Sequence, residues 1–175
     1  MLVGQRHDEA VKVSGGKMRT KGGKAVCITG HSRDCCASPR SLARVCAMTP
    51  FTATITAQDA DIDELGHVNN SVWVRWIQDM ATAHWQAAAL PEHVAAYVWV
   101  VVRHEIDFLD NIAAGESVEG RTWVGEAPRG AKFDRHVEFM RDGKVIVRAK
   151  TTWAILDRGT GRILRVPKDV AGRFV

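Results

Sequence analysis

The sequence lacks long hydrophobic runs and confines two residue types to separate parts of the chain. No stretch of the 175 residues approaches the roughly 18 uninterrupted apolar residues of a membrane-spanning helix. This absence excludes a transmembrane helix and predicts that the protein has no membrane partner. Residues 1–47 contain no Phe, Trp or Tyr, and residues 48–175 contain no Cys.

Charge is divided at the same boundary. Residues 1–47 hold nine Lys and Arg against three Asp and Glu, whereas residues 48–175 hold 15 against 17. A segment without aromatic residues and rich in Gly, Lys and Arg can bury little apolar surface. We therefore predict a basic, flexible extension over residues 1–47 and one folded domain over residues 48–175. The overall positive charge then gives no reason to expect a specific nucleic-acid partner.

Three interpretations of residues 1–47 remain open. The first is a flexible tail, or sequence upstream of a natural start at Met48. The second is a targeting peptide, although the segment lacks the apolar stretch of a secretory signal. The third is a metal site, because Cys27, His31, Cys35 and Cys36 lie close together, but they lack the paired Cys-x2-Cys spacing of zinc modules. We favour the first and expect a cytoplasmic protein without a bound metal.

The folded part follows the order strand, loop, helix and then several strands. Over residues 71–89 apolar residues recur with the i, i+3, i+4, i+7 spacing of a helix. Asn70 suits the N-cap, and Pro91 ends the helix. Strand patterns cover residues 51–59, 97–108, 117–126, 132–141 and 145–156, with a short strand expected over 162–166 and a helical turn after Pro167.

One long apolar helix followed by a meander of strands predicts an α+β fold in which helix and sheet share a core. Asp142-Gly143 between apolar runs predicts a hairpin turn. We expect an antiparallel sheet of about five to six strands wrapped around the helix.

The residues that suit catalysis lie directly before the helix, in Asp61-Ile-Asp63-Glu-Leu-Gly66-His67-Val-Asn69-Asn70. The N–H groups and dipole at the helix start can hold an oxyanion. A carboxylate beside them could attack a carbonyl or activate water, which suits acyl transfer. The same residue types also cap helices and tie turns. From the residues alone, a catalytic and a purely structural role both remain open.

The pattern Asp-x-x-Gly-His-Val-Asn-Asn, followed by an aromatic residue and a helix, resembles the hotdog-fold acyl thioesterases. The resemblance is closest to the 4-hydroxybenzoyl-CoA thioesterase-like branch, and His-Val-Asn-Asn with Trp76-Ile77 is also similar to plant-type acyl-carrier-protein thioesterases. The stretches His104–Leu109, Gly115–Val118 and Gly161–Val170 are similar to later parts of the family pattern. The resemblance covers about residues 51–174.

This resemblance implies a hotdog fold and hydrolysis of an acyl-CoA thioester to free acid and CoA, with no cofactor. It also implies a homodimer or homotetramer in which sheets join edge to edge and active sites lie at the interface. By the same resemblance Asp63 is the catalytic carboxylate, as nucleophile or general base, and Asn70 supplies a backbone N–H to the oxyanion hole. His67 and Asn69 orient substrate or water, or brace the loop.

Substrate contacts are expected from Gly66, Trp73, Arg129 and Lys132. Many relatives have a tyrosine where this chain has Trp73, and the loop with the two cations is expected to meet the CoA phosphates. Asp79, the only acidic residue on the expected helix, is the alternative carboxylate.

Two other functions are considered: acyl-carrier-protein thioesterase and non-catalytic acyl-CoA binding. A hydratase of the same fold is disfavoured, because Leu65-Gly66 stand where that branch has Asn-Pro. The sequence leaves the acyl chain preference open.

Overall fold

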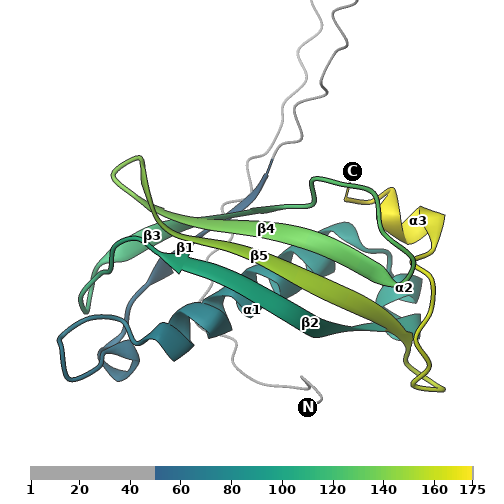
Figure 1. Cartoon of the computed structure of the whole chain (residues 1–175), viewed down its shortest axis with the longest axis horizontal. Helices are drawn as coiled ribbons and strands as arrows, with labels where there is room; N and C mark the ends of the chain where they lie inside the picture. The colour runs from purple at the N-terminus through teal and green to yellow at the C-terminus, as the bar shows by residue number, and fades with distance from the viewer. Residues whose placement is uncertain (1–49, 175) are drawn as a thin grey trace, which may run out of the picture. The chain divides into compact units, whose positions relative to one another are not determined.

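A five-stranded antiparallel sheet with a long helix on one face forms the core of the protein (Figure 1). The structure is a computed structural model that describes residues 50–174. The predicted extension over residues 1–47, with its four cysteines, lies outside the described residues. The elements in chain order are β1 (Phe51–Thr56), η1 (Asp59–Asp61), α1 (Asn70–Ala88), α2 (Pro91–Ala96), β2 (Tyr97–Phe108), β3 (Ser117–Trp123), β4 (Lys132–Arg141), β5 (Lys144–Asp157) and α3 (Lys168–Ala171).

The strands are arranged in the order β1-β3-β4-β5-β2, and every neighbouring pair is antiparallel. The helix α1 lies behind this sheet in Figure 1. The predicted hotdog fold, a long helix wrapped by an antiparallel sheet, is confirmed. None of the helices within residues 50–174 is both long and apolar enough to span a membrane.

Aromatic and aliphatic side chains on one face of α1 make the core. Trp73, Trp76, Ile77 and Met80 are buried against the inward-facing residues of the sheet. The helix packs tightly at Gly120 of β3, where an added Cβ would lie 2.8 Å from the sulfur of Met80. The absence of a side chain at this position therefore permits the close packing of α1 on the sheet.

The start of α1 differs by one residue from the prediction. Asn69, not Asn70, is the N-cap: its backbone is extended and its side-chain oxygen accepts a hydrogen bond from the N–H of Ser71 at 2.9 Å. Two adjacent asparagines suit the cap equally well by sequence. The choice is made by tertiary pairing, because the N–H of Asn69 donates to the carbonyl of Asp61 at 2.9 Å.

The helix ends before Pro91, as predicted: the last residue of α1 is Ala88. Pro91 is also the first residue of a second helix, α2, which was not predicted. Proline is well suited to the first helical position because its missing N–H would have no partner there.

Most strand bounds agree with the predictions. β2 and β4 have the expected bounds, and Asp142 (φ 51°) and Gly143 (φ 76°) form the expected turn between β4 and β5. β1 and β3 end three residues earlier than expected. The short strand expected over residues 162–166 is reduced to a single bridge between Ile163 and Leu156.

β2 is an outer strand of the sheet and carries exposed apolar side chains. Val100, Val102 and Phe108 on this strand, and Leu109 directly after it, are 37 to 58% exposed. An edge of 12 residues with free backbone groups and apolar side chains is a template for pairing with another strand.

Candidate active site

The loop before α1 holds Asp63 in a tight turn. A bridge between Ile62 and Val68 closes the loop, and the N–H of Asp63 donates to the carbonyl of His67 at 2.8 Å. Gly66 adopts φ 78°, a conformation that favours glycine. The N–H of Leu65 donates to Oδ1 of Asp63 at 2.9 Å, which orients the carboxylate. Oδ2 accepts no hydrogen bond from residues 50–174 and is free to act on a ligand.

Asp61, two residues earlier, has a different role. Its side chain is buried, pairs with Arg75 and accepts a hydrogen bond from the N–H of Gln58 at 3.0 Å. Both oxygens of Asp61 are therefore occupied. Asp61 is therefore a structural carboxylate, whereas Asp63 is half-buried and has one oxygen without a hydrogen-bond donor among residues 50–174.

The start of α1 presents a free donor beside this loop. The N–H of Ser71 is occupied by the side chain of Asn69, whereas the N–H of Asn70 has no acceptor within the described part of the chain. Asn70 is exposed. A helix start combines unpaired N–H groups with the positive end of the dipole, so this position can stabilise a developing negative charge on oxygen.

The other residues expected near the motif divide into exposed and buried ones. Gly66 and His67 are exposed, and the His67 side chain makes no hydrogen bond to residues 50–174. Trp73 has no exposed surface; it packs edge-on against Trp76 with ring centroids 4.8 Å apart. Its contribution in this structure is therefore to the core beneath the helix start.

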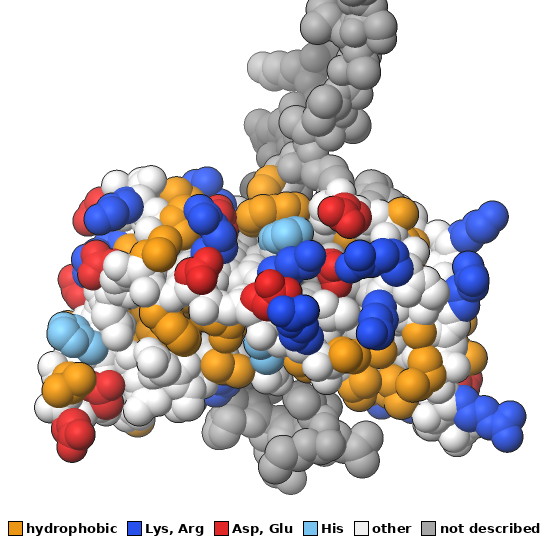
Figure 2. All heavy atoms as spheres, in the orientation of Figure 1, with side chains coloured by type: hydrophobic (Ala, Val, Ile, Leu, Met, Phe, Trp, Pro, Cys, Tyr) orange, Lys and Arg blue, Asp and Glu red, His pale blue; other side chains and the backbone are white. Residues whose placement is uncertain are grey.

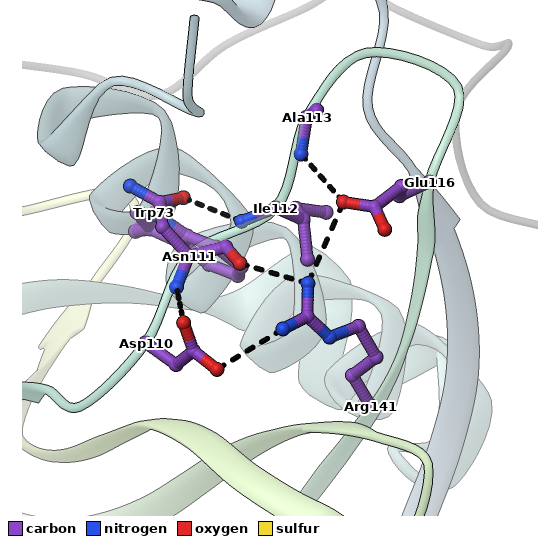
Figure 3. A network of polar contacts seen from close by, with 7 residues as sticks. All are labelled: Trp73, Asp110, Asn111, Ile112, Ala113, Glu116 and Arg141. Atoms are coloured by element: carbon purple, nitrogen blue, oxygen red, sulfur yellow. Dashed lines mark hydrogen bonds and ion pairs between the residues drawn. The ribbon is translucent and has the colours of Figure 1, made fainter. Parts of the chain in front are cut away.

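A single asparagine, Asn111, joins the motif loop to the loop between β2 and β3. Figure 3 shows Asn111 beside Trp73 of α1 and Arg141. Oδ1 of Asn111 accepts from Nε1 of Trp73 at 3.3 Å and from the N–H of Ile112, and its Nδ2 donates to the carbonyl of Val68 at 3.0 Å. The N–H of Val68 donates in turn to the carbonyl of Ile112 at 3.0 Å. These bonds hold the end of the motif loop where it enters α1.

An ion pair at the edge of the core supports Asn111 from the sheet. Arg141 donates to the carbonyl of Asn111 and to Oδ2 of Asp110, both at 3.0 Å (Figure 3). The hydrogen bond from the N–H of Asn111, together with the nearby positive charges of Arg141 and Lys144, lowers the pKa of Asp110. The sequence analysis missed this network, because Asp110-Asn111 has the composition of an ordinary polar loop.

Arg129 and Lys132 lie at the other end of the sheet from Asp63. β1 leads into the motif loop, and the register Thr56 to Ser117 and Phe51 to Thr122 places the far end of β3 away from it. The structure therefore does not bring the two cations together with Asp63 within one chain.

Arg129 already has a partner. Its guanidinium donates to Oδ2 of buried Asp134 at 2.7 Å, and Lys150 lies 3.2 Å from the same oxygen. Burial opposes ionisation of Asp134, but hydrogen bonds from Thr152 and Lys150 outweigh it and lower the pKa. Figure 2 shows such acidic and basic side chains next to one another on the sheet face opposite α1.

A pocket of about 220 Å³ lies between the second half of α1, β2, the end of the sheet and Phe174. None of its lining residues belongs to the motif loop. Arg135 of β4 lines it and is buried; Nη1 donates to Nδ1 of His84 at 2.7 Å and to Thr122 at 3.1 Å. Burial, reinforced by the positive charge of Arg135, lowers the pKa of His84 to about 4.

The sequence pattern of β4 contains a signal for Arg135. Along β4 the inward positions are Phe133, Arg135, Val137 and Phe139. A charged residue at a position of the strand that otherwise faces the apolar core is unusual, because a buried charge is costly without compensation.

Within residues 50–174, no three His, Cys, Asp or Glu side chains are gathered as ligands for a metal ion.

Comparison with known proteins identifies the family. A family model described as the thioesterase-like superfamily matches residues 57–174. The chain belongs to this superfamily. The chloroplastic palmitoyl-acyl carrier protein thioesterase of Arabidopsis thaliana is 29% identical over 78 residues, which are 44% of this chain and 19% of that relative. The chain thus spans less than a fifth of the length of the curated relatives it matches.

Solved structures share the superfamily fold. The 1,4-dihydroxy-2-naphthoyl-CoA thioesterase Slr0204 from Synechocystis has a TM-score of 0.59 and 16% identity, covering 68% of this chain and 90% of that chain. SAV2348 from Staphylococcus aureus, solved in complex with CoA, has a TM-score of 0.63 and 14% identity, covering 72% and 82%. At these identities the likeness establishes the hotdog fold.

Replacing Asn111 tests its role in holding the motif loop. In Asn111→Ala the Trp73 Nε1–H and the Val68 carbonyl lose their partner, so the free energy of unfolding should fall by about 1–3 kcal/mol. Urea denaturation measures this change. The control, Glu126→Ala at an exposed position between β3 and β4, should stay within about 0.5 kcal/mol of wild type. Equal stability of the two variants would contradict the role assigned to Asn111.

The partly buried His84 predicts a pH dependence of stability. His84 stays neutral in the native state down to its pKa of about 4, while the unfolded chain binds a proton near pH 6.5. Stability contributed by neutral His84 is therefore complete above about pH 6.5 and is lost as the pH falls toward 4. Urea titrations from pH 8 to pH 4 should show a shallower decline for His84→Gln than for wild type. Parallel declines would disprove this assignment.

Proposed function

We propose that this protein is a thioesterase that hydrolyses acyl-CoA to a free acid and CoA. The observation that carries the proposal is the pairing of two groups in a member of the thioesterase-like superfamily. The first is the Asp63 carboxylate, oriented by the Leu65 N–H with one oxygen unoccupied. The second is the free N–H of Asn70 at the start of α1.

The chemistry can begin in two ways. Either Asp63 attacks the thioester carbon, expelling the CoA thiolate and leaving an anhydride that water cleaves, or Asp63 removes a proton from water, which attacks directly. In both routes negative charge develops on the thioester oxygen. The N–H of Asn70 and the helix dipole stabilise that charge. In the first route the thiolate leaves as the anhydride forms and takes up a proton once water has cleaved the anhydride. In the second route the proton that Asp63 removes from water passes to the departing thiolate.

The remaining motif residues support these two groups. Asn69 acts through the helix: by binding the Ser71 N–H it fixes the backbone that presents the Asn70 N–H. His67 is exposed at the loop tip, where its ring can contact substrate or water. Gly66 leaves space for substrate to approach the backbone of the loop. A Cβ added at Gly66 would meet no neighbouring atom within 4 Å, so no other side chain covers this position.

CoA is the proposed carrier of the acyl group. The CoA-bound structure of SAV2348 shares the fold, and we propose that Arg129 and Lys132 bind CoA phosphates. Because these cations lie at the end of the sheet away from Asp63, they would serve an active site completed by another copy of the chain.

A homodimer formed through β2 would supply that second copy. β2 is an edge strand with exposed apolar side chains, which suits antiparallel pairing with the same strand of a partner. An acyl-carrier-protein substrate is the second candidate, favoured by the local similarity to the plant palmitoyl-acyl carrier protein thioesterase. The same assay, run with acyl-CoA and acyl-carrier-protein substrates, separates the two.

Removing the Asp63 carboxylate tests the catalytic proposal. Asp63→Asn keeps the size of the side chain and its acceptor for the Leu65 N–H, but removes the nucleophile or base. We expect thiol release from acyl-CoA to fall at least about 100-fold, with unchanged circular dichroism. Glu64→Gln, an exposed neighbour, is the matched control and should retain activity. Near-wild-type turnover by Asp63→Asn would overturn the proposal.

A charge on the β2 edge tests the dimer. Val102 is 50% exposed on β2, and Ile163, which is 68% exposed away from that strand, provides the control. Sedimentation velocity should show wild type and Ile163→Lys as dimers or tetramers, and Val102→Lys shifted toward monomer with lower activity. A wild-type particle of 19.3 kDa would refute the dimer.

A further inference from the structure

Unpaired positive charges gather in one segment near the C-terminal end of the described chain. On the strands, Arg103, Arg121 and Arg148 each lie beside a glutamate. By contrast, none of the ion pairs among residues 50–174 includes a cation of residues 157–174, the positive segment. The cations of the positive segment, all exposed, are Arg158, Arg162, Arg165, Lys168 and Arg173.

The carboxylates of the positive segment do not neutralise these cations. Residues 157–174 contain two Asp and no Glu. Oδ1 of Asp157 accepts hydrogen bonds from the N–H and the hydroxyl of Thr160 at 2.7 and 2.8 Å, and Oδ2 of Asp169 binds Nε2 of His93 at 3.0 Å. The segment therefore keeps a net positive charge, although residues 48–175 as a whole hold more Asp and Glu than Lys and Arg.

The loop before β4 adds to this charge. The N–H of Val166 donates to the carbonyl of Gly130 at 2.9 Å, so this loop lies against the positive segment. Lys132, two residues after Gly130, is exposed and takes part in no ion pair among the described residues. At the other end of the sheet, residues 58–67 contain four carboxylates and no Lys or Arg. Positive and negative charge are therefore separated along the domain.

An aliphatic side chain projects from the middle of the positive segment. Ile163 is 68% exposed, and its backbone forms a bridge with Leu156 at the end of β5. Alternate side chains of an extended segment point to opposite sides. Leu164 and Val166 pack into the core, so Ile163 and Arg165 face outward together.

Ile163 extends an aliphatic row on the sheet. Directly opposite residues of antiparallel strands share a face. The bridge from Ile163 to Leu156 and the register pair of Leu156 with Val98 therefore place three aliphatic side chains side by side. Figure 2 shows hydrophobic side chains over the end of β5, with Lys and Arg side chains projecting at the edge beside them. This end of the domain thus combines an apolar strip with unpaired cations.

The projecting side chain distinguishes two kinds of anionic partner. A protein partner is usually anchored by side chains that enter pockets, and neither Ile163 nor its neighbours Arg162 and Arg165 line the pocket beside α1. A lipid surface needs no recess, because an apolar side chain can enter the bilayer while cations stay at the level of the headgroups. The observations therefore favour an anionic lipid surface over an acidic protein.

We propose that the positive segment binds the surface of an anionic lipid bilayer. Ile163 enters the boundary between headgroups and acyl chains, and Arg162, Arg165 and Lys168 lie beside anionic headgroups. Each Lys or Arg near such a surface strengthens binding, and the contributions add. Burial of an aliphatic side chain strengthens it further.

Binding to a lipid surface requires no spanning helix. The expectation that the protein has no membrane partner was based on the lack of such a helix, which the described residues confirm, and peripheral binding is compatible with that finding. Lipid binding also does not depend on Asp63 or on thioester hydrolysis. Either proposal can fail without the other.

Vesicle sedimentation with the full-length protein tests the proposal. The vesicles contain phosphatidylcholine alone, or phosphatidylcholine mixed with phosphatidylglycerol. We expect the wild type to bind the mixed vesicles at least about tenfold more tightly than the neutral ones. Equal binding to both kinds, or no binding to the mixed vesicles, would overturn the proposal.

Two double variants with the same loss of charge locate the binding. Arg162→Gln/Arg165→Gln changes the positive segment, and Arg121→Gln/Arg148→Gln changes β3 and β5 at exposed ion pairs. Residues 1–47 are present in both, so their positive charge contributes equally. The first variant should bind mixed vesicles at least about tenfold more weakly than the second. Equal affinity of the two would show that the positive segment is not the binding surface.

A soluble polyanion separates a lipid surface from an acidic protein. Ile163→Ser should bind mixed vesicles at least about threefold more weakly than the wild type, yet bind poly-L-glutamate equally well. Leu65→Ser, which removes an exposed aliphatic side chain at the other end of the domain, should bind both probes as the wild type does. Unchanged vesicle binding by Ile163→Ser would indicate an acidic protein partner instead, and equal losses on both probes would also contradict insertion of Ile163 into lipid.

Discussion

The hydrogen bonds of Asn111 join the three segments on which the candidate active site depends. They connect the Val68 carbonyl at the end of the motif loop, the indole of Trp73 in the first turn of α1 and the loop that leads into β3. Because Trp73 is also buried in the core, the position of the helix start is tied directly to hydrophobic packing. The candidate catalytic groups, half-buried Asp63 and exposed Asn70, thereby rest on a closely packed interior, which favours electrostatic preorganisation.

The inner face of the sheet differs in packing and polarity between its two ends. Beneath the first half of α1 it is apolar and closely packed, with Phe139 and Val147 against the tryptophans of the helix. Beneath the second half it carries Thr122, Arg135 and the pocket. The interface between α1 and the sheet is therefore closely packed near the proposed catalytic end and contains a positively charged pocket at the other end.

Much of the fold was predictable because its signals are local. The apolar periodicity of α1 and the strand-type composition of β2 and β4 depend only on neighbouring residues, and the positive φ of Asp142 and Gly143 follows from turn chemistry. The helix start could not be fixed in this way. Asn69 and Asn70 are equivalent as caps, and a hydrogen bond from the Asn69 N–H to Asp61, earlier in the chain, distinguishes them.

The candidate site was predicted only in part, because some of its contacts also come from distant parts of the chain. Asp63 and the helix start were recognisable as one short motif, whereas Asn111 acts from a loop 43 residues after Val68, whose carbonyl it binds. No local pattern reveals such a partner. The separation of Arg129 from Asp63 likewise depends on strand register, which places the two loops at opposite ends of β3.

The contact between Met80 and Gly120 has a consequence for how this family can vary. The sulfur of Met80 occupies the space that a Cβ at position 120 would need, so the two positions share one volume. A side chain at position 120 of β3 must displace the flexible end of Met80, against which Phe139 also packs, unless the residue on α1 is smaller. A change at one position therefore alters the space available at the other. Among related sequences we therefore expect these two positions to covary, with the helix residue shrinking wherever the strand glycine is replaced.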